Sequence, residues 1–467
     1  MKNLPNAPWF QPIVHQQCLH KAYNTLPVAL RNIDVIEPHI MFQLFFSDEI
    51  FETICTNTNL YAADKKAKKA TGDGKGMGRK WVDTSIEEIK CWLGIVIYMG
   101  VVNLPAVRDF WRHDGLFPTH DFAAYMTQMR FEDIKGCLHV APPHQKAIDD
   151  SGRRLWHGKV ELLMQQVQNS SQNYRVSSSN ISIDEAMICC TGRSQDTYKT
   201  PFKPISEGLK FHCAADHGFI FDFHPTSQKH GPDPIAQDIM EEGLSNTSSL
   251  VLEMISRLPK HLAFNLYLDN YYTSLPLLSS LRKKGVGACG TARTSSKMFP
   301  PELVVPKNKS SQLGYHERAG MVVDEVAIML WMDNAPVSMM TTIHQLKGRG
   351  SEVQKERRRP GLKSSNAAGI RKSKIFDEGE WRTLLNIPRC IDDYNHHMGG
   401  VDIADQYRSY YDTQLISLRT WFPIFFWLVD TALINSFIMY SDLDKSLEHK
   451  EFRIQVAWSL ILSSAGI

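Results

Sequence analysis

Three aspartates have positions and spacing that could hold divalent metal ions. Asp184 follows a β-branched stretch, VSSSNISI, which predicts a strand ending at Asp184, and Asp269 ends a second predicted strand, HLAFNLYLD. Asp402 follows 133 residues later, near an expected helix start. Shared carboxylates can hold two hard cations about 3.5–4 Å apart for in-line phosphoryl transfer. Spacing alone is weak evidence, because a chain with 50 acidic residues contains many such trios.

Basic residues near these aspartates could contact phosphate groups. A second basic segment, KKAKKATGDGKGMGRK at 65–80, has seven basic residues, one acidic residue and four glycines, which predicts a solvated, mobile loop. For each of these basic residues, the sequence is compatible with two interpretations: an ordinary surface charge or a contact to phosphate. The candidates for DNA phosphate contact are Lys203, Lys210, Arg293, Arg193, Lys65, Lys66, Lys68 and Lys69.

Other catalytic chemistries have less support in the sequence. The histidines between 212 and 230, with Cys213 and Asp216, match no common zinc-ligand spacing, so we interpret them as structural or surface residues. The chain has no GxSxG motif, no base evident beside Cys189 or Cys190, and no GxxxxGK[ST] phosphate loop.

The composition is that of a globular protein of several domains. The chain has 467 residues, 43% of them hydrophobic and 22% charged, and a net charge of +2, so nucleic-acid binding would depend on local basic patches. Nine scattered cysteines without a CxxC pair favour a reducing compartment. Residues 1–17 lack a charged-then-apolar leader and are typical of an extended arm.

The segment 420–440, TWFPIFFWLVDTALINSFIMY, is long enough to span a bilayer. Asp430 and Asn435 lie in its interior, and a mid-span Asp costs on the order of 3 kcal/mol. We therefore expect a helix buried in a protein core.

Hydrophobic periodicity predicts an alternation of helical and sheet regions. Helices are expected at 36–62, across most of 83–180, at 247–258 and at 274–285, and strands at 208–216 and 219–226 around a turn at His217-Gly218. Further strands are expected at 286–292, in VVDEVAIMLWMD and in PVSMMTTIH, whereas the basic stretch 347–374 predicts a long loop. Regular structure is expected to return at 401.

Several long motifs, in order, resemble those of piggyBac transposases. SIDEAMICCTGR (182–193) is similar to the block around the family's first catalytic aspartate, and LYLDNYYTSLPLLSSLRKKGVGACGTART (266–294) is similar to the second. DDYNHHMGGVDIADQYRSYY (392–411) is similar to the third block. The resemblance covers residues 36 to about 460.

This resemblance implies an α/β protein: an RNase H-like catalytic domain with a β-rich insertion, plus a bipartite, mainly helical DNA-binding and dimerisation domain. It implies that Asp184, Asp269 and Asp402 bind Mg²⁺ or Mn²⁺, with Asp405 as a fourth carboxylate. The implied activity is cut-and-paste transposition of double-stranded DNA, with strand nicking, hairpin formation and strand transfer at TTAA targets. A homodimer in the nucleus follows from the same resemblance, and KERRRP (355–360) is a weak import signal.

The implied domain boundaries follow the motifs. We expect an N-terminal arm, a first and a second part of the helical domain, a first and a second part of the catalytic domain, and an insertion with a basic loop. In that scheme the arm is 1–35, the helical domain 36–178 and 407–467, the catalytic domain 179–293 and 388–406, and the insertion 294–387.

Well-studied family members end in a cysteine-rich zinc-binding domain, which is not found in this sequence. Recognition of DNA ends is then expected to depend on other surfaces or on a partner, or to have been lost. The alternative function is a domesticated transposase-derived protein that binds DNA without cleaving it.

Overall fold

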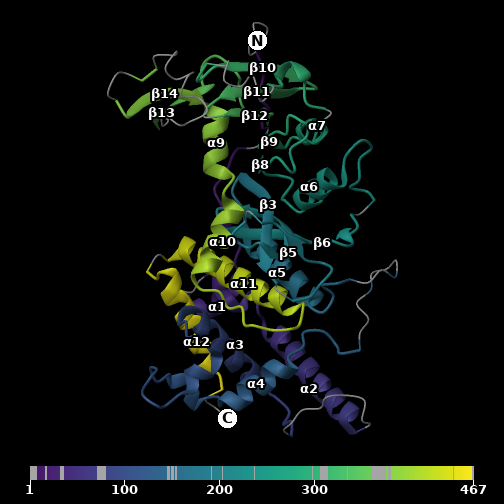
Figure 1. Ribbon diagram of the computed structural model, residues 1–467, viewed down its shortest axis with the longest axis vertical. Helices are drawn as coiled ribbons and strands as arrows, with labels where there is room; N and C mark the ends of the chain where they lie inside the picture. Colours follow the sequence, from purple (N-terminus) through teal and green to yellow (C-terminus); the bar gives the residue numbers. More distant parts are fainter. Residues whose placement is uncertain are drawn as a thin grey trace.

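The computed structural model describes most of the chain (Figure 1). The described residues are 8–15, 18–31, 36–70, 80–144, 148, 152, 155–190, 192–201, 203–235, 237–296, 298–305, 314–333, 335–359, 375–376, 380–444 and 446–464; within them, the side chains of 68–70 are not described.

A ten-stranded mixed sheet forms the centre of the molecule, in the order β10-β11-β12-β9-β8-β3-β5-β6-β7, with β4 also paired to β5. Strands β3, β8 and β9 are parallel to one another, and the remaining neighbours are antiparallel. The strands are β3 (Asn180–Cys189), β4 (Tyr198–Lys199), β5 (Glu207–Asp216), β6 (Phe219–Ser227), β7 (Gly231–Pro232), β8 (Asn265–Leu268), β9 (Gly287–Thr291), β10 (Arg318–Val323), β11 (Val326–Met332) and β12 (Pro336–Thr341).

Two smaller sheets and a set of helices complete the fold. The short strands are β1 (Tyr23–Asn24) with β2 (Arg175–Val176), and β13 (Glu352–Arg358) with β14 (Arg382–Pro388). The helices are α1 (Pro38–Gln43), α2 (Asp48–Ala70), α3 (Ile86–Val101), α4 (Gln128–Cys137), α5 (Glu161–Tyr174), α6 (Asn246–Ser256), α7 (Leu275–Lys283), α9 (Arg389–His397), α10 (Gly400–Tyr410), α11 (Phe422–Leu443) and α12 (His449–Leu462).

The molecule is elongated, with β10 to β14 at one end and α2, α3 and α4 at the other (Figure 1). Helices α9 and α10 run from the first end to the middle, where β3, β5 and β6 lie. Because β12 is hydrogen-bonded to β9, three strands of the expected insertion extend the central sheet. The mixed α/β fold with a large central sheet agrees with the expected fold class.

Local sequence signals account for several elements. The turn between β5 and β6 has His217 at φ 47° and Gly218 at φ 96°, as the His-Gly pair predicts. Ser85 caps α3 by accepting a hydrogen bond from the backbone N–H of Glu88. Gly285, at φ 77°, follows α7 in the left-handed region that favours glycine.

Helix α11 is the predicted core helix. Among the described residues it is the one helix long and apolar enough to cross a membrane, and 89% of its most apolar window is buried inside the protein. Within it, Asp430 forms a 3.0 Å ion pair with Arg453 of α12, and both side chains are almost fully buried. A core position explains both its length and its internal charge.

Three expectations about strands were wrong. Strand β3 continues to Cys189, because β5 pairs with it as far as Cys189, so Asp184 is in mid-strand. VVDEVAIMLWMD is split by a turn at Asp324 and Glu325, which have positive φ. Regular structure is present before the expected return at 401, since β13 begins at Glu352 and β14 at Arg382.

Both basic segments are more ordered than predicted. Helix α2 continues through 65–70, where Ala and Lys favour helix, and 71–79 lie outside the described residues. In the second segment, 352–358 form β13, which alternates more and less exposed residues against β14, and 360–374 lie outside the described residues.

The N-terminal arm lies extended along the protein. Its Ile13 N–H donates to the carbonyl of Thr342 at 2.7 Å, and Tyr23 in β1 pairs with Val176 in β2. The side chain of Phe10 is buried in a cluster with residues of β11 and α9. The described parts of the arm therefore contact both the region after β12 and the strand β2 that precedes β3.

Candidate active site

The register of the sheet places Asp184 and Asp269 side by side. Parallel pairing of β3 with β8 matches Ile183 to Leu268, so the next residues, Asp184 and Asp269, occupy neighbouring positions. Adjacent strands lie about 4.8 Å apart. The parallel pairing stops at this point, although β3 itself continues.

Helix α10 brings the third aspartate to the same place. A Cβ atom on Gly400 would lie 2.3 Å from Oγ of Ser182 and 3.1 Å from the carbonyl oxygen of Ala215, so the start of α10 contacts β3 and β5. Asp402 lies in the first turn of α10, two residues later. Ser182 and Asp184 are two apart in β3 and share a face of the sheet, which is the face α10 covers.

Of the two glycines before Asp402, the second has a structural explanation. A Cβ on Gly399 would meet nothing within 4 Å, whereas Gly400 allows the helix to approach the sheet closely. Close packing therefore explains the second glycine.

The charges of these carboxylates affect one another. Burial raises the pKa of Asp184 to about 7, and the negative charges of Glu185, Asp402 and Asp269 contribute to the increase. A carboxyl group held among other carboxylates has a raised pKa because ionisation adds to the local negative charge. A cluster of this kind favours a bound cation.

The hydrogen bonds of Asp184 and Asp269 leave acceptor capacity on both carboxylates. Asp184 accepts a 2.8 Å bond from the backbone N–H of Glu185, and Asp269 accepts a 3.4 Å bond from the hydroxyl of Thr291. Asp402 is exposed to solvent. A carboxylate has about four lone-pair positions, so each can accept further ligands.

Asp405 lies one helical turn after Asp402, as its spacing predicts. It forms a 3.1 Å ion pair with Arg408, which also donates to the carbonyl of Met187 in β3. Burial raises the pKa of Asp405, Arg408 opposes this, and Asp402 adds to it. Arg408 therefore links Asp405 to β3, and Asp402 lacks such a link among the described residues.

A cleft of about 640 Å³ lies beside α10 and contains Asp402 and Asp405. Its other wall includes Glu185, Lys203 and Cys189. In the described part of the chain, no three His, Cys, Asp or Glu side chains are arranged to hold a metal ion. The aspartates thus occupy neighbouring backbone positions without forming a closed ligand set.

A family model described as Transposase IS4 matches residues 37–437 of this chain. Human PiggyBac transposable element-derived protein 2 is 24% identical over 440 residues, which are 92% of this chain and 66% of that protein. Human PiggyBac transposable element-derived protein 3 is 26% identical over 435 residues, which are 90% of this chain and 64% of that protein. The chain belongs to the piggyBac transposase family.

A solved piggyBac structure has a similar fold. The cryo-EM structure of the piggyBac transposase synaptic complex with hairpin DNA superposes with a TM-score of 0.70 at 20% identity, and the match covers 95% of this chain and 83% of that one. This likeness concerns the fold. The chain spans slightly less than two thirds of the length of the two human relatives.

Two of the residues predicted to contact phosphate lie next to the aspartate cluster. Lys203 and Lys210 bind opposite oxygens of Glu185, at 2.8 and 2.7 Å. Burial raises the pKa of Glu185, but the two lysines outweigh it and lower that pKa to about 2. Sequence reasoning did not select Glu185, although its position directly after Asp184 was a signal.

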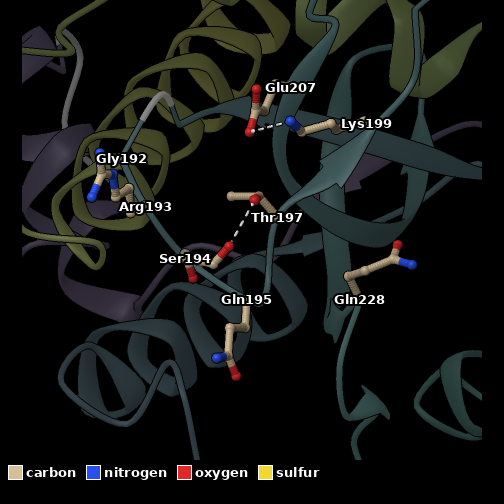
Figure 2. Close-up of a pocket in the computed structure, with 8 residues that line it drawn as sticks. All are labelled: Gly192, Arg193, Ser194, Gln195, Thr197, Lys199, Glu207 and Gln228. Carbon is tan, nitrogen blue, oxygen red and sulfur yellow. Dashed lines mark hydrogen bonds and ion pairs between the residues drawn. The ribbon is translucent and has the colours of Figure 1, made fainter.

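Arg293 is near the cluster as well. Its Nε donates a 2.9 Å bond to the side-chain oxygen of Asn270, the residue after Asp269. Arg193, in contrast, lines a separate hollow of about 780 Å³ with Gly192, Ser194 and Gln195 (Figure 2). In that hollow, Lys199 pairs with Glu207 at 3.7 Å.

The lysines of α2 are not part of the cluster. Lys65 donates a 3.0 Å bond to the carbonyl of Gly136 at the end of α4, so it joins two helices, and Lys66 is exposed. The side chains of Lys68 and Lys69 lie outside the described residues. Helix α2 is at the opposite end of the molecule from β13 and β14 (Figure 1).

The strand histidines have structural partners. His212 and His224 are direct partners across β5 and β6. His212 Nδ1 is 2.6 Å from the hydroxyl of Tyr272, and His224 Nε2 is 3.1 Å from Asp222. Within the described residues, these histidines are not arranged with other ligands to hold a metal ion.

Proposed function

We propose that this chain is a metal-dependent DNA transposase of the cut-and-paste type. The single observation that carries the proposal is the placement of three aspartates. Asp184 and Asp269 come from adjacent strands, and Asp402 comes from the helix that packs on them. We also propose that β3, β5, β6, β8 and β9 form an RNase H-like core.

The chemistry of the donor set supports Mg²⁺ or Mn²⁺ as the bound ions. Carboxylate oxygens are the ligands that hard divalent cations prefer, and the raised pKa of Asp184 indicates uncompensated negative charge. Asp184, Asp269 and Asp402 would hold the ions, with Asp405 as a supporting carboxylate. Bound ions would supply activation of the attacking oxygen and stabilisation of the leaving oxygen.

The proposed reaction is phosphoryl transfer on double-stranded DNA. The oxygen of a water molecule attacks a phosphorus atom at a transposon end, and the bond from phosphorus to the 3′-oxygen breaks. The freed 3′-hydroxyl then attacks a phosphorus atom of the opposite strand and displaces its 3′-oxygen, which forms a hairpin. Water opens the hairpin at the same phosphorus atom and releases the 3′-hydroxyl, which attacks a phosphorus atom at a TTAA target and displaces a 3′-oxygen of the target. We propose a homodimer, because two ends must be paired, and action in the nucleus.

The chain's own residues would orient the DNA. Lys203, on the cleft wall, and Arg293, beside Asn270, are placed to contact phosphates near the aspartates. The solved relative was determined with hairpin DNA, which supports a DNA substrate.

A cleavage assay tests this proposal. Labelled duplexes carrying the flanking element ends are incubated with Mg²⁺ or Mn²⁺ and either wild-type protein or Asp269→Asn, with Asp238→Asn, an exposed aspartate elsewhere, as the control. We expect nicked and hairpinned products from the wild type and the control, and a decrease of about 10³-fold or more in Asp269→Asn, because metal ions stabilise the transition state by several kcal/mol. Equal cleavage by wild type and Asp269→Asn would disprove the assigned role.

The second candidate function is DNA binding without cleavage. It is favoured by the absence of a closed metal-ligand group among the described residues. Equal DNA binding by both proteins with no metal-dependent product from either would support it.

A further inference from the structure

An exposed tyrosine lies next to the aspartate cluster. Tyr271 is two residues after Asp269, in the turn between β8 and α7, and is 39% exposed. Backbone bonds from Tyr272 and Thr273 to the carbonyl of Asp269, at 3.0 and 3.1 Å, fix this turn. The same hydrogen bonds therefore determine the position of Tyr271 relative to Asp269.

The two adjacent tyrosines of this turn have different environments. Tyr272 is buried, and its hydroxyl is 2.6 Å from Nδ1 of His212, so it anchors the turn to β5. Tyr271 is partly in solvent, where an aromatic ring gains less from burial. A tyrosine at position 272 is explained because it stabilises the turn. A tyrosine at position 271 does not have this explanation.

Cationic groups surround the ring of Tyr271. The ammonium of Lys210 lies 4.6 Å from the ring centroid, and the guanidinium of Arg293 lies 5.7 Å from it. The ring of His212 is nearly parallel, at 9° and 5.9 Å. Contacts of this kind are worth about 0.5–1 kcal/mol at exposed sites, and they hold the ring in one orientation.

Arg293 supplies a charge that the protein does not neutralise within the described residues. Its partner Asn270 is an uncharged amide, and Arg293 is exposed, whereas Lys210 is bound to Glu185. A guanidinium can form two parallel hydrogen bonds to a phosphate. An ordered, exposed ring next to an available guanidinium matches a nucleotide, since a base stacks on the ring and its phosphate binds the cation.

We propose that Tyr271 and Arg293 bind one unpaired nucleotide of the DNA next to the aspartates. The base stacks on Tyr271, and the adjacent phosphate contacts Arg293. The inference rests on the proposed DNA function, and it specifies that the substrate strand is unpaired at this position.

Fluorescence anisotropy with two DNA probes tests this inference. The first probe is a fluorescein-labelled hairpin with a loop of four unpaired nucleotides, and the second is a blunt duplex of the same stem sequence. The full chain is compared as wild type, Tyr271→Phe, Tyr271→Leu, Tyr271→Ala and Arg293→Ala. Tyr125→Ala is the matched control, because Tyr125 has a similar exposure of 38% and lies in a different region.

We expect the wild type to prefer the hairpin. Tyr271→Leu and Tyr271→Ala should weaken hairpin binding by about 5- to 160-fold, the range for loss of one base–aromatic stack, and leave duplex binding unchanged. Tyr271→Phe and Tyr125→Ala should stay within about 2-fold of wild type, because stacking needs the ring and not the hydroxyl. Arg293→Ala should weaken hairpin binding and make it less dependent on salt.

A second readout reports the base itself. With 2-aminopurine in the loop, the wild type and Tyr271→Phe should quench its fluorescence, and Tyr271→Leu should not. Equal hairpin and duplex binding, unaffected by Tyr271→Leu, would overturn this inference and leave the proposed DNA function intact. Failure of the wild type to bind either probe would overturn both.

Discussion

Two buried or partly buried aspartates of this protein differ in the charges that surround them. Asp430 in α11 is fully buried and pairs with Arg453, which also donates to the carbonyl of Tyr411 at 2.7 Å and to Nε2 of His449 at 3.0 Å. Asp184 in β3 is partly buried, and the charged groups that raise its pKa, Glu185, Asp402 and Asp269, are all negative. An arginine of the protein neutralises the negative charge of Asp430, whereas the negative charge of Asp184 is available to a bound cation.

This difference separates structural charge from functional charge. Burial raises the pKa of Asp430 to about 6, although Arg453 opposes the increase. Removing one partner of a buried pair leaves an uncompensated charge, which is strongly destabilising. Removing a charge from a cluster of like charges has the opposite effect, because it relieves repulsion.

The largest expected effect on stability is at the buried pair. Arg453→Met should lower the free energy of unfolding by about 3–5 kcal/mol, since Asp430 then lacks its cation. Urea denaturation measures this, and the double variant Arg453→Met, Asp430→Leu should recover part of the loss. If Arg453→Met were as stable as wild type, the structural interpretation of this pair would fail.

At a third site, the negative charges of two carboxylates are neutralised by a protonated histidine. His157 is buried between Asp233 and Glu161, each at 2.8 Å, and these carboxylates outweigh burial and raise its pKa to about 9. A raised histidine pKa stabilises the fold fully below the unfolded value of about 6.5, and this stabilisation is lost as pH rises through 9.

The free energy of unfolding should therefore fall by about 2–3 kcal/mol between pH 6.5 and pH 9.5 through His157. His157→Gln should remove most of this dependence, which denaturation at several pH values measures. An unchanged pH profile in the variant would exclude His157 as its source.

The aspartate cluster should respond to added cations, unlike the buried pair. Mg²⁺ at ten times its dissociation constant should raise the free energy of unfolding by about 1.4 kcal/mol, by mass action. Thermal denaturation with and without Mg²⁺ measures this shift. We expect Asp269→Asn to lose the shift and Asp238→Asn to keep it; a shift of equal size in both would place the bound ion elsewhere.

The smallest expected effect has the opposite sign to that at Arg453. In metal-free buffer at pH 8, Asp184→Asn should raise the free energy of unfolding by on the order of 1 kcal/mol, because it removes a charge from the cluster. Urea denaturation in EDTA compares it with the wild type. Destabilisation by Asp184→Asn would mean that its carboxylate has a structural role similar to that of Asp430.

Local sequence signals predicted a large part of this structure. The apolar stretch 420–440 predicted the core helix, the His217-Gly218 pair predicted the turn, and the strand before Asp269 ends directly before it. These elements depend on periodicity and on backbone conformations that single residues favour, so a short window of sequence determines them.

The candidate site was predicted only in part. The sequence identified Asp184, Asp269 and Asp402 through motif resemblance, and their close placement depends on the parallel register of β3 with β8 and on the contact of α10 with the sheet. It placed Asp184 at a strand end, because the longer antiparallel pairing with β5 cannot be inferred from residues 175–184 alone.

The sequence by itself determined the family of this protein, its core helix and the residues that could do chemistry. Only the tertiary structure decided which charges are compensated: Asp430 by Arg453, Glu185 by two lysines, and Asp184 by no cation of the described protein at hydrogen-bonding distance. The physical reason is that electrostatic interactions depend on distance and burial in space, which sequence separation does not fix.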